Sequence, residues 1–85
     1  MAVTIKSLDD VERECNRFLQ RVRVARAVLR GELRGHNKRW EQIDREAGRQ
    51  HHPLQEESFS HGCAATGAAR RASLDLTRVL ADFRK

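Results

Sequence analysis

SLDDVERECNRFLQRVRVARAVLRGELR, residues 7–34, decides the fold of this chain. Apolar residues recur through it at alternating spacings of three and four, which is the pattern of one face of an α-helix. Ser7 stands where an N-cap is expected, and Gly35 stands where a left-handed residue would end the helix. The stretch therefore predicts one helix of about seven turns over 7–34. Its apolar face consists of Leu8, Val11, Cys15, Phe18, Val22, Ala25 and Leu29.

A short middle helix is predicted over 38–50, with Asn37 as its N-cap. Its apolar face is small, comprising Trp40, Ile43 and Ala47. A helix of about 12 residues is marginal in water by itself. We therefore expect it to pack onto the first helix, with Trp40 as the anchor.

The helical pattern breaks at Pro53, because proline disfavours helix in the residue before it. This predicts a loop over 51–60 and a last helix over 61–84. The last helix has a single apolar stripe, formed by Ala65, Ala69, Ala72, Leu76, Val79, Leu80 and Phe83.

The predicted fold is all-α, an antiparallel hairpin of two long helices with the short helix between them. Residues 1–85 are expected to form a single helical domain that begins with a flexible arm over 1–6. A chain of 85 residues buries only about two-thirds of its surface, so its core is thin. Self-association into a bundle is one way to compensate for a thin core.

The composition restricts location and partners. Arginine outnumbers lysine fourteen to three, and the net charge is +5. No apolar run approaches the roughly 20 residues that cross a bilayer, and the first twenty residues carry charges throughout. We expect a cytoplasmic protein with no membrane contact. A basic chain of this kind suits an acidic protein or a nucleic acid as partner.

The cysteines and histidines give little support to chemistry. Cys15 and Cys63 lie near the starts of helices that run in opposite directions, so no disulfide is expected between them. His61 and Cys63 form the only local pair with metal-binding or nucleophilic character, and their spacing matches no standard zinc site. We expect no metal, no cofactor and no enzymatic activity. A weak metal or thiol site at this pair is the remaining alternative.

Each long helix carries a second apolar group away from its main stripe. Val24 and Val28 lie on the far side of the first helix, and Leu74 lies opposite the stripe of the last. Packing of the middle helix through Trp40 and Ile43 is one way to cover the two valines, while Leu74 suggests a contact surface for another chain. Scattered apolar groups on a protein surface are also normal, so the alternative that these residues have no binding role stays open. The predicted partner-binding residues are Val24, Val28 and Leu74, with a rim of Arg23, Arg26, Arg30, Arg71 and Arg78.

A different class of function also fits the arginines. Arg23, Arg26, Arg30 and Arg34 form one ridge, and a second ridge consists of Arg13, Arg17 and Arg21. Such ridges suit a phosphate backbone, bound without regard to sequence. Acidic residues share the same helices, and mixed charge on a solvated face is common. The sequence leaves a nucleic-acid-binding protein as the second hypothesis.

The stretch AARRASLDLTR, residues 68–78, resembles the closing helix of small uncharacterised proteins from temperate phages and prophages. The resemblance covers the last quarter of the chain and transfers no site. It implies an accessory protein of a mobile element, of the kind that binds and modulates one host protein. Our first hypothesis is thus a non-enzymatic protein-interaction module that binds a host protein, or itself as a homodimer.

Overall fold

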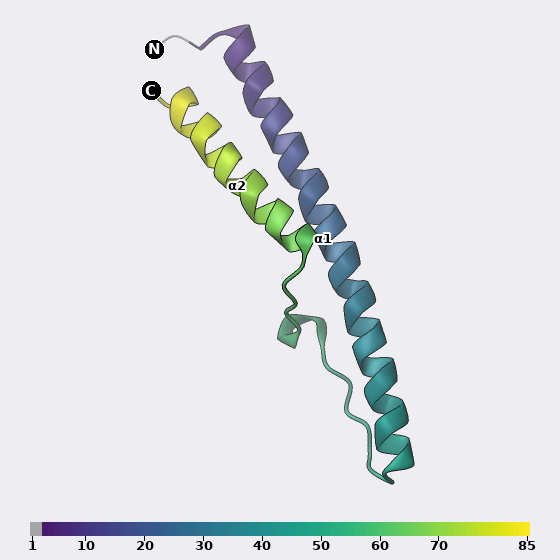
Figure 1. The fold of residues 1–85 in the computed structure, drawn as a ribbon. Helices are drawn as coiled ribbons and strands as arrows, with labels where there is room; N and C mark the ends of the chain where they lie inside the picture. The colour runs from purple at the N-terminus through teal and green to yellow at the C-terminus, as the bar shows by residue number, and fades with distance from the viewer. Residues whose placement is uncertain (1–2) are drawn as a thin grey trace. The chain divides into compact units, whose positions relative to one another are not determined.

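The structure, a computed structural model, describes residues 3–85 and contains helices but no strands within that range. Helix α1 spans Ile5–Glu46 and helix α2 spans Ala64–Phe83, with a single-turn 3₁₀ helix η1 at Glu56–Ser58 between them (Figure 1). The predicted all-α hairpin of two long helices is confirmed.

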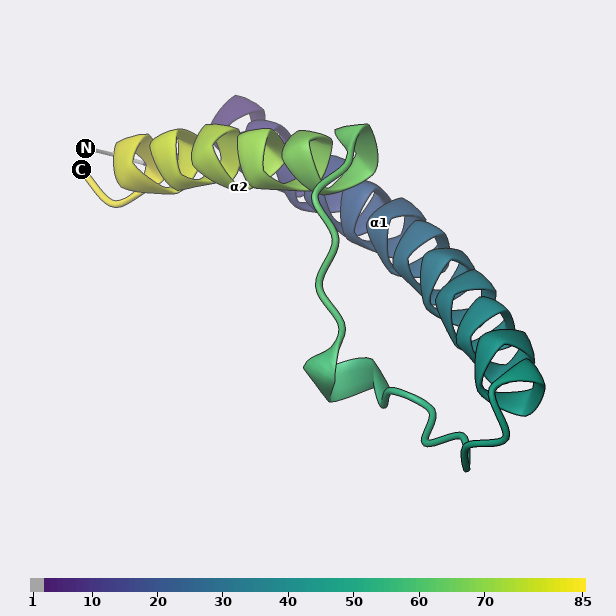
Figure 2. The ribbon, with the colours of Figure 1, turned by 60° about the horizontal axis from the view of Figure 1, so that its bottom comes forward.

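The chain divides into two compact units. The hairpin unit consists of residues 3–25 and 62–85, and the loop unit consists of residues 26–61. In the hairpin unit, α2 runs antiparallel beside the first half of α1, and the two remain side by side in both views (Figures 1 and 2). The loop unit contains the second half of α1 and the segment that follows it, including η1.

The core of the hairpin unit lies along the line where α1 and α2 meet. Ala72 on α2 is only 1% exposed, and Ala25 on α1 is also buried. Val11, Phe18, Leu76 and Val79 are partly covered. Leu8, predicted as part of the buried stripe, is instead exposed. A small side chain at the tightest point lets the two helices approach closely, so the core is narrow.

Helix α1 begins earlier than expected, and its N-cap is Thr4 rather than Ser7. The Thr4 and Ser7 side chains each accept a hydrogen bond from the other residue's backbone N–H, both at 3.0 Å. This reciprocal pair has the geometry of a capping box, with Ser7 in the third helical position. The predicted arm over 1–6 is therefore wrong for Ile5 and Lys6, which are helical. Met1 and Ala2 lie outside the described residues.

Helix α1 also continues through the predicted turn at 35–37. A separate middle helix over 38–50 is wrong, because residues 38–46 are the last turns of α1. Gly35 costs about 1 kcal/mol in a helix relative to alanine, which tertiary contacts outweigh. Asn37, expected as an N-cap, instead pairs its side-chain amide with the backbone of Leu54, at 2.9 and 3.1 Å. Trp40 cannot anchor a second helix to the first, because it belongs to α1 and is exposed.

Helix α1 ends at a left-handed glycine further along, Gly48, whose φ is +72°. The Gly48 N–H donates to the carbonyl of Arg45, and the Arg49 N–H donates to the carbonyl of Asp44. These two bonds are those of a Schellman motif, which satisfies the last carbonyls of a helix. The left-handed stop predicted at Gly35 is wrong: Gly35 lies inside α1, and the left-handed glycine that ends the helix is Gly48.

Helix α2 starts at Ala64, three residues after the predicted start of 61, and ends at Phe83. Cys63 is the N-cap residue, and its backbone N–H donates to Thr66 Oγ1 at 3.1 Å. The predicted loop over 51–60 lies within the connection between the long helices and contains η1. Cys15 and Cys63 are not joined by a disulfide.

Candidate protein-binding faces

All three apolar residues predicted to contact a partner are exposed. Leu74 is 61% exposed, Val24 is 46% exposed and Val28 is 36% exposed. Leu74 comes two residues after the buried Ala72 and therefore points away from α1, since two steps along a helix reverse the direction of a side chain. The expected cover of the valines by a middle helix is wrong, because no such helix folds back on them.

Three arginines surround Leu74 on α2. Arg70 and Arg71 lie one turn before it and Arg78 lies one turn after it, so all three share its side of the helix. Each is exposed, and none forms an ion pair with a carboxylate among residues 3–85. We call this surface, Arg70, Arg71, Leu74 and Arg78, the α2 outer face. It presents an uncovered leucine within uncompensated positive charge.

The arginines predicted on α1 differ in their surroundings. Arg30 donates from Nε to Glu56 Oε1 at 2.8 Å, so its charge is locally balanced. Arg23 and Arg26 have no carboxylate partner within the described chain. The predicted rim is therefore uncompensated at Arg23, Arg26, Arg71 and Arg78, and paired at Arg30.

The second predicted ridge is mostly neutralised. Arg13 pairs with Asp10 at 3.1 Å, and Arg17 pairs with Glu14 at 3.2 Å and with Asp75 on α2 at 2.9 Å. The hydrogen bonds that the Arg17 guanidinium donates to Asp75 and to Glu14 raise its pKa above the ordinary value. Arg17 therefore links the two helices of the hairpin unit and is unsuited to lead a phosphate-binding ridge.

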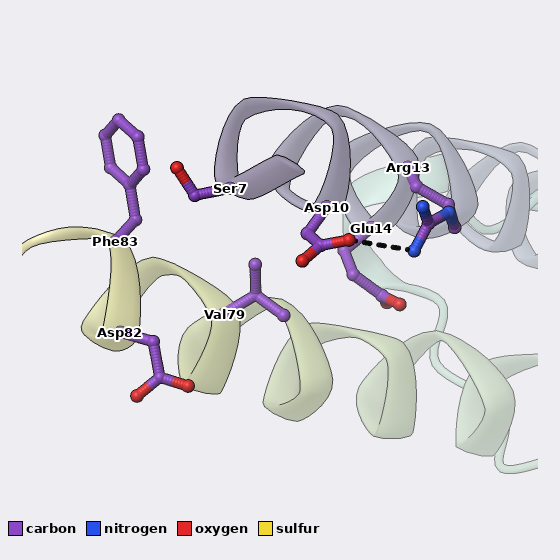
Figure 3. Close-up of a pocket in the computed structure, with 7 residues that line it drawn as sticks. All are labelled: Ser7, Asp10, Arg13, Glu14, Val79, Asp82 and Phe83. Atoms are coloured by element: carbon purple, nitrogen blue, oxygen red, sulfur yellow. Dashed lines mark hydrogen bonds and ion pairs between the residues drawn. The ribbon is translucent and has the colours of Figure 1, made fainter. Parts of the chain in front are cut away.

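A cleft of about 440 Å³ opens between the start of α1 and the end of α2, both in the hairpin unit. Figure 3 shows Val79 pointing toward α1 at its floor, with acidic side chains along the α1 side. The lining consists of Ser7, Asp10, Arg13, Glu14, Val79, Asp82 and Phe83. A hydrogen bond from Lys6, with further help from Arg13, lowers the pKa of the Asp10 carboxyl. Asp10 is thus a carboxylate acceptor and is poorly suited to donate a proton.

This acidic cleft was not predicted from the sequence. Asp10 and Glu14 come from α1 and Asp82 comes from α2, so only the fold brings them to one place. The available signal was the spacing of Asp10 and Glu14, one turn apart beside the apolar stripe.

The loop unit contains all four histidines of the chain. Asp44 of α1 accepts from His51 Nδ1 at 3.2 Å and pairs with Arg49 at 3.2 Å. The hydrogen bond from His51, with that from Arg49, lowers the pKa of Asp44. His36 stacks at a tilt against Phe59, with ring centroids 5.9 Å apart, and His61 lies parallel to Phe59 at 6.3 Å. These rings hold the loop segment in place.

No cluster of three or more His, Cys, Asp or Glu side chains that would hold a metal occurs among residues 3–85. None of the helices in that range is long and apolar enough to cross a membrane. No family model, curated protein or solved structure matches this chain. The candidate site therefore rests on the geometry of the chain itself.

Proposed function

We propose that this chain is a non-enzymatic protein-interaction module that binds an acidic helical protein through the α2 outer face. One observation carries the proposal: Leu74 is exposed on a well-formed helix and lies among three arginines that have no carboxylate partner in the described chain. An apolar residue ringed by unpaired charge of one sign matches a surface that supplies a leucine pocket and carboxylates.

The expected energetics are those of a small interface. Full burial of a leucine contributes about 1.5–3 kcal/mol, of which Leu74 has more than half still available. Arginine pairs with carboxylates through two parallel hydrogen bonds, which adds orientation to affinity. Arginine is also enriched at the centres of protein interfaces.

The biological setting is part of the same proposal. The resemblance of residues 68–78 to phage and prophage proteins covers Arg70, Arg71, Leu74 and Arg78, which are the α2 outer face. We propose an accessory protein of a temperate phage that acts in the host cytoplasm, where its partner is a host protein.

The test is binding of a synthetic amphipathic helix with a leucine stripe flanked by glutamates, followed by fluorescence anisotropy. Leu74→Ala should weaken binding about tenfold or more, because it removes most of the apolar surface that the partner would bury. A tenfold change corresponds to about 1.4 kcal/mol. Asn16→Ala, at an exposed position on α1, is the matched control and should bind like the wild type. Equal affinity for the wild type and Leu74→Ala would show that the α2 outer face is not the binding surface.

A nucleic-acid-binding function is the second candidate, and one observation favours it. Ten cations lack a carboxylate partner among the described residues: Arg21, Arg23, Arg26, Arg34, Lys38, Arg39, Arg70, Arg71, Arg78 and Arg84. Duplex DNA binding at roughly 50 and 200 mM salt separates the two candidates, because phosphate contacts lose orders of magnitude in affinity over that range. A DNA binder would be insensitive to Leu74→Ala and sensitive to Arg71→Ala and Arg78→Ala. The protein-binding proposal predicts that Leu74→Ala matters most.

A further inference from the structure

We propose that the hairpin unit pairs with a second copy of this chain through one side of the α1–α2 seam, to form an antiparallel four-helix bundle. The surface, which we call the apolar flank, consists of Leu8, Cys15 and Leu19 on α1 with Leu76 and Leu80 on α2. It is distinct from the α2 outer face, which points away from α1.

The two sides of the seam differ in chemistry. On one side lie the Arg17–Asp75 ion pair and the acidic cleft with Asp10 and Glu14. Leu8, Cys15 and Leu19 are spaced by seven and four residues, so they align along α1 on the other side. Leu8 is 51% exposed and Leu19 is 47% exposed. The apolar surface of α1 is therefore wider than the part that α2 covers, and about half of the surface of Leu8 and of Leu19 remains in water.

On α2, the polar side chains beside Leu76 and Leu80 already have hydrogen-bond partners within the helix. Ser73 donates its hydroxyl hydrogen to the Arg70 carbonyl at 2.6 Å, and Thr77 donates to the Ser73 carbonyl at 2.9 Å. A buried hydroxyl is costly only when it has no hydrogen-bond partner. Because both hydroxyls already donate within α2, a partner can cover them at little cost.

The charges on the flank point to a second copy as the occupant. Glu12 and Arg23 border Leu19 on α1, eleven residues or about three turns apart, so they share one side of the helix. Neither forms an ion pair within the described chain. When two α1 helices pair antiparallel about their midpoint, Glu12 of each copy meets Arg23 of the other. The contact therefore occurs twice, as a two-fold interface requires.

The available area is sufficient for a dimer. Twenty residues of helix span about 30 Å, and two helices side by side are about 20 Å wide, which gives roughly 600 Å² per copy. Pairing two such faces buries about 1,200 Å², at the lower end of specific protein interfaces. A concentration-dependent dimer is thus expected.

Sedimentation equilibrium of the full chain, from about 1 μM to about 1 mM, tests the proposal over the range of weak to firm association. The wild type should be dimeric at the upper end. Glu12→Arg and Arg23→Glu should each weaken the dimer about tenfold, because each places like charges opposite one another twice. The double variant Glu12→Arg with Arg23→Glu should restore the wild-type affinity, since it recreates both pairs in reverse order.

Leu19→Glu and Leu8→Glu should abolish the dimer, and far-UV circular dichroism should show that each remains helical. The charge variants keep the test decisive if a leucine variant fails to fold. Leu74→Glu, on the α2 outer face, should leave the dimer intact. A wild type that stays monomeric throughout would overturn the proposal, and so would a double charge variant no better than either single one.

Discussion

Glycine has opposite effects on stability at two places in the chain: Gly35 weakens the interior of α1, whereas Gly48 stabilises its end. Gly35 lies inside α1 with nothing within 4 Å of the position that a Cβ would occupy. Gly48 has a φ of +72°, a backbone conformation that is strained for residues with a Cβ atom. The sequence suggested a stop at Gly35 because this glycine directly follows the periodic stretch 7–34. Gly48 is identified as the stop by its φ and by the Schellman hydrogen bonds, which only the folded backbone shows.

The two glycines give a matched pair of substitutions. Gly35→Ala should stabilise the protein by about 1 kcal/mol, because alanine is the better helix former and meets no neighbour. Gly48→Ala should destabilise it by about 1 kcal/mol, because it forces a Cβ into the left-handed region. Urea unfolding followed by circular dichroism measures both. Changes of the same sign would contradict the assigned end of α1.

At the scale of elements, the loop segment that follows α1 contacts the part of the helix that passes through the predicted turn. The Asn37 side chain forms hydrogen bonds with the Leu54 backbone. Arg30 forms an ion pair with Glu56, and the His36 ring contacts the Phe59 ring. All these contacts join the second half of α1 to residues distant in sequence. The periodicity of 7–34 predicted the first part of the helix well, but it gave no sign of these contacts beside the part of α1 that continues past Gly35.

Acid should loosen this attachment. The Asp44 pKa is lowered in the folded chain, so its contribution to stability is present above its unfolded pKa and is lost as the pH falls through the folded value. Trp40, the only tryptophan, lines the same pocket as Asp44 and His51. Its fluorescence should therefore change below about pH 4, and this acid limb should shrink in Asp44→Asn. Glu41→Gln is the control, because Glu41 pairs within α1, with Arg45.

At the scale of the whole molecule, the described chain has few buried residues, namely Ala25, Leu33 and Ala72. Its ion pairs are largely exposed, and such pairs contribute at most about 1 kcal/mol each. Stability therefore depends on close packing along narrow contacts, and the hairpin unit is most sensitive where Ala72 meets α1.

Enlarging that position should be costly. Ala72→Leu should destabilise the protein by about 1–3 kcal/mol, because the added methylene groups force the two helices apart. Ala81→Leu makes the same change at an exposed position of α2 and should have little effect. Thermal unfolding followed by circular dichroism distinguishes them. Equal melting temperatures would mean that the seam does not limit stability.

The sequence by itself determined the helical class, the two long helices, the antiparallel pairing and the exposure of Leu74. These follow from hydrophobic periodicity, which is local and survives any error in the turns. Only the tertiary structure decided the continuity of α1 past Gly35, the exposure of Val24 and Val28, and the pairing of Arg17 with Asp75 and of Arg30 with Glu56. Capping preferences and charge patterns are weak, about 1 kcal/mol or less each, so contacts between residues distant in the chain override them.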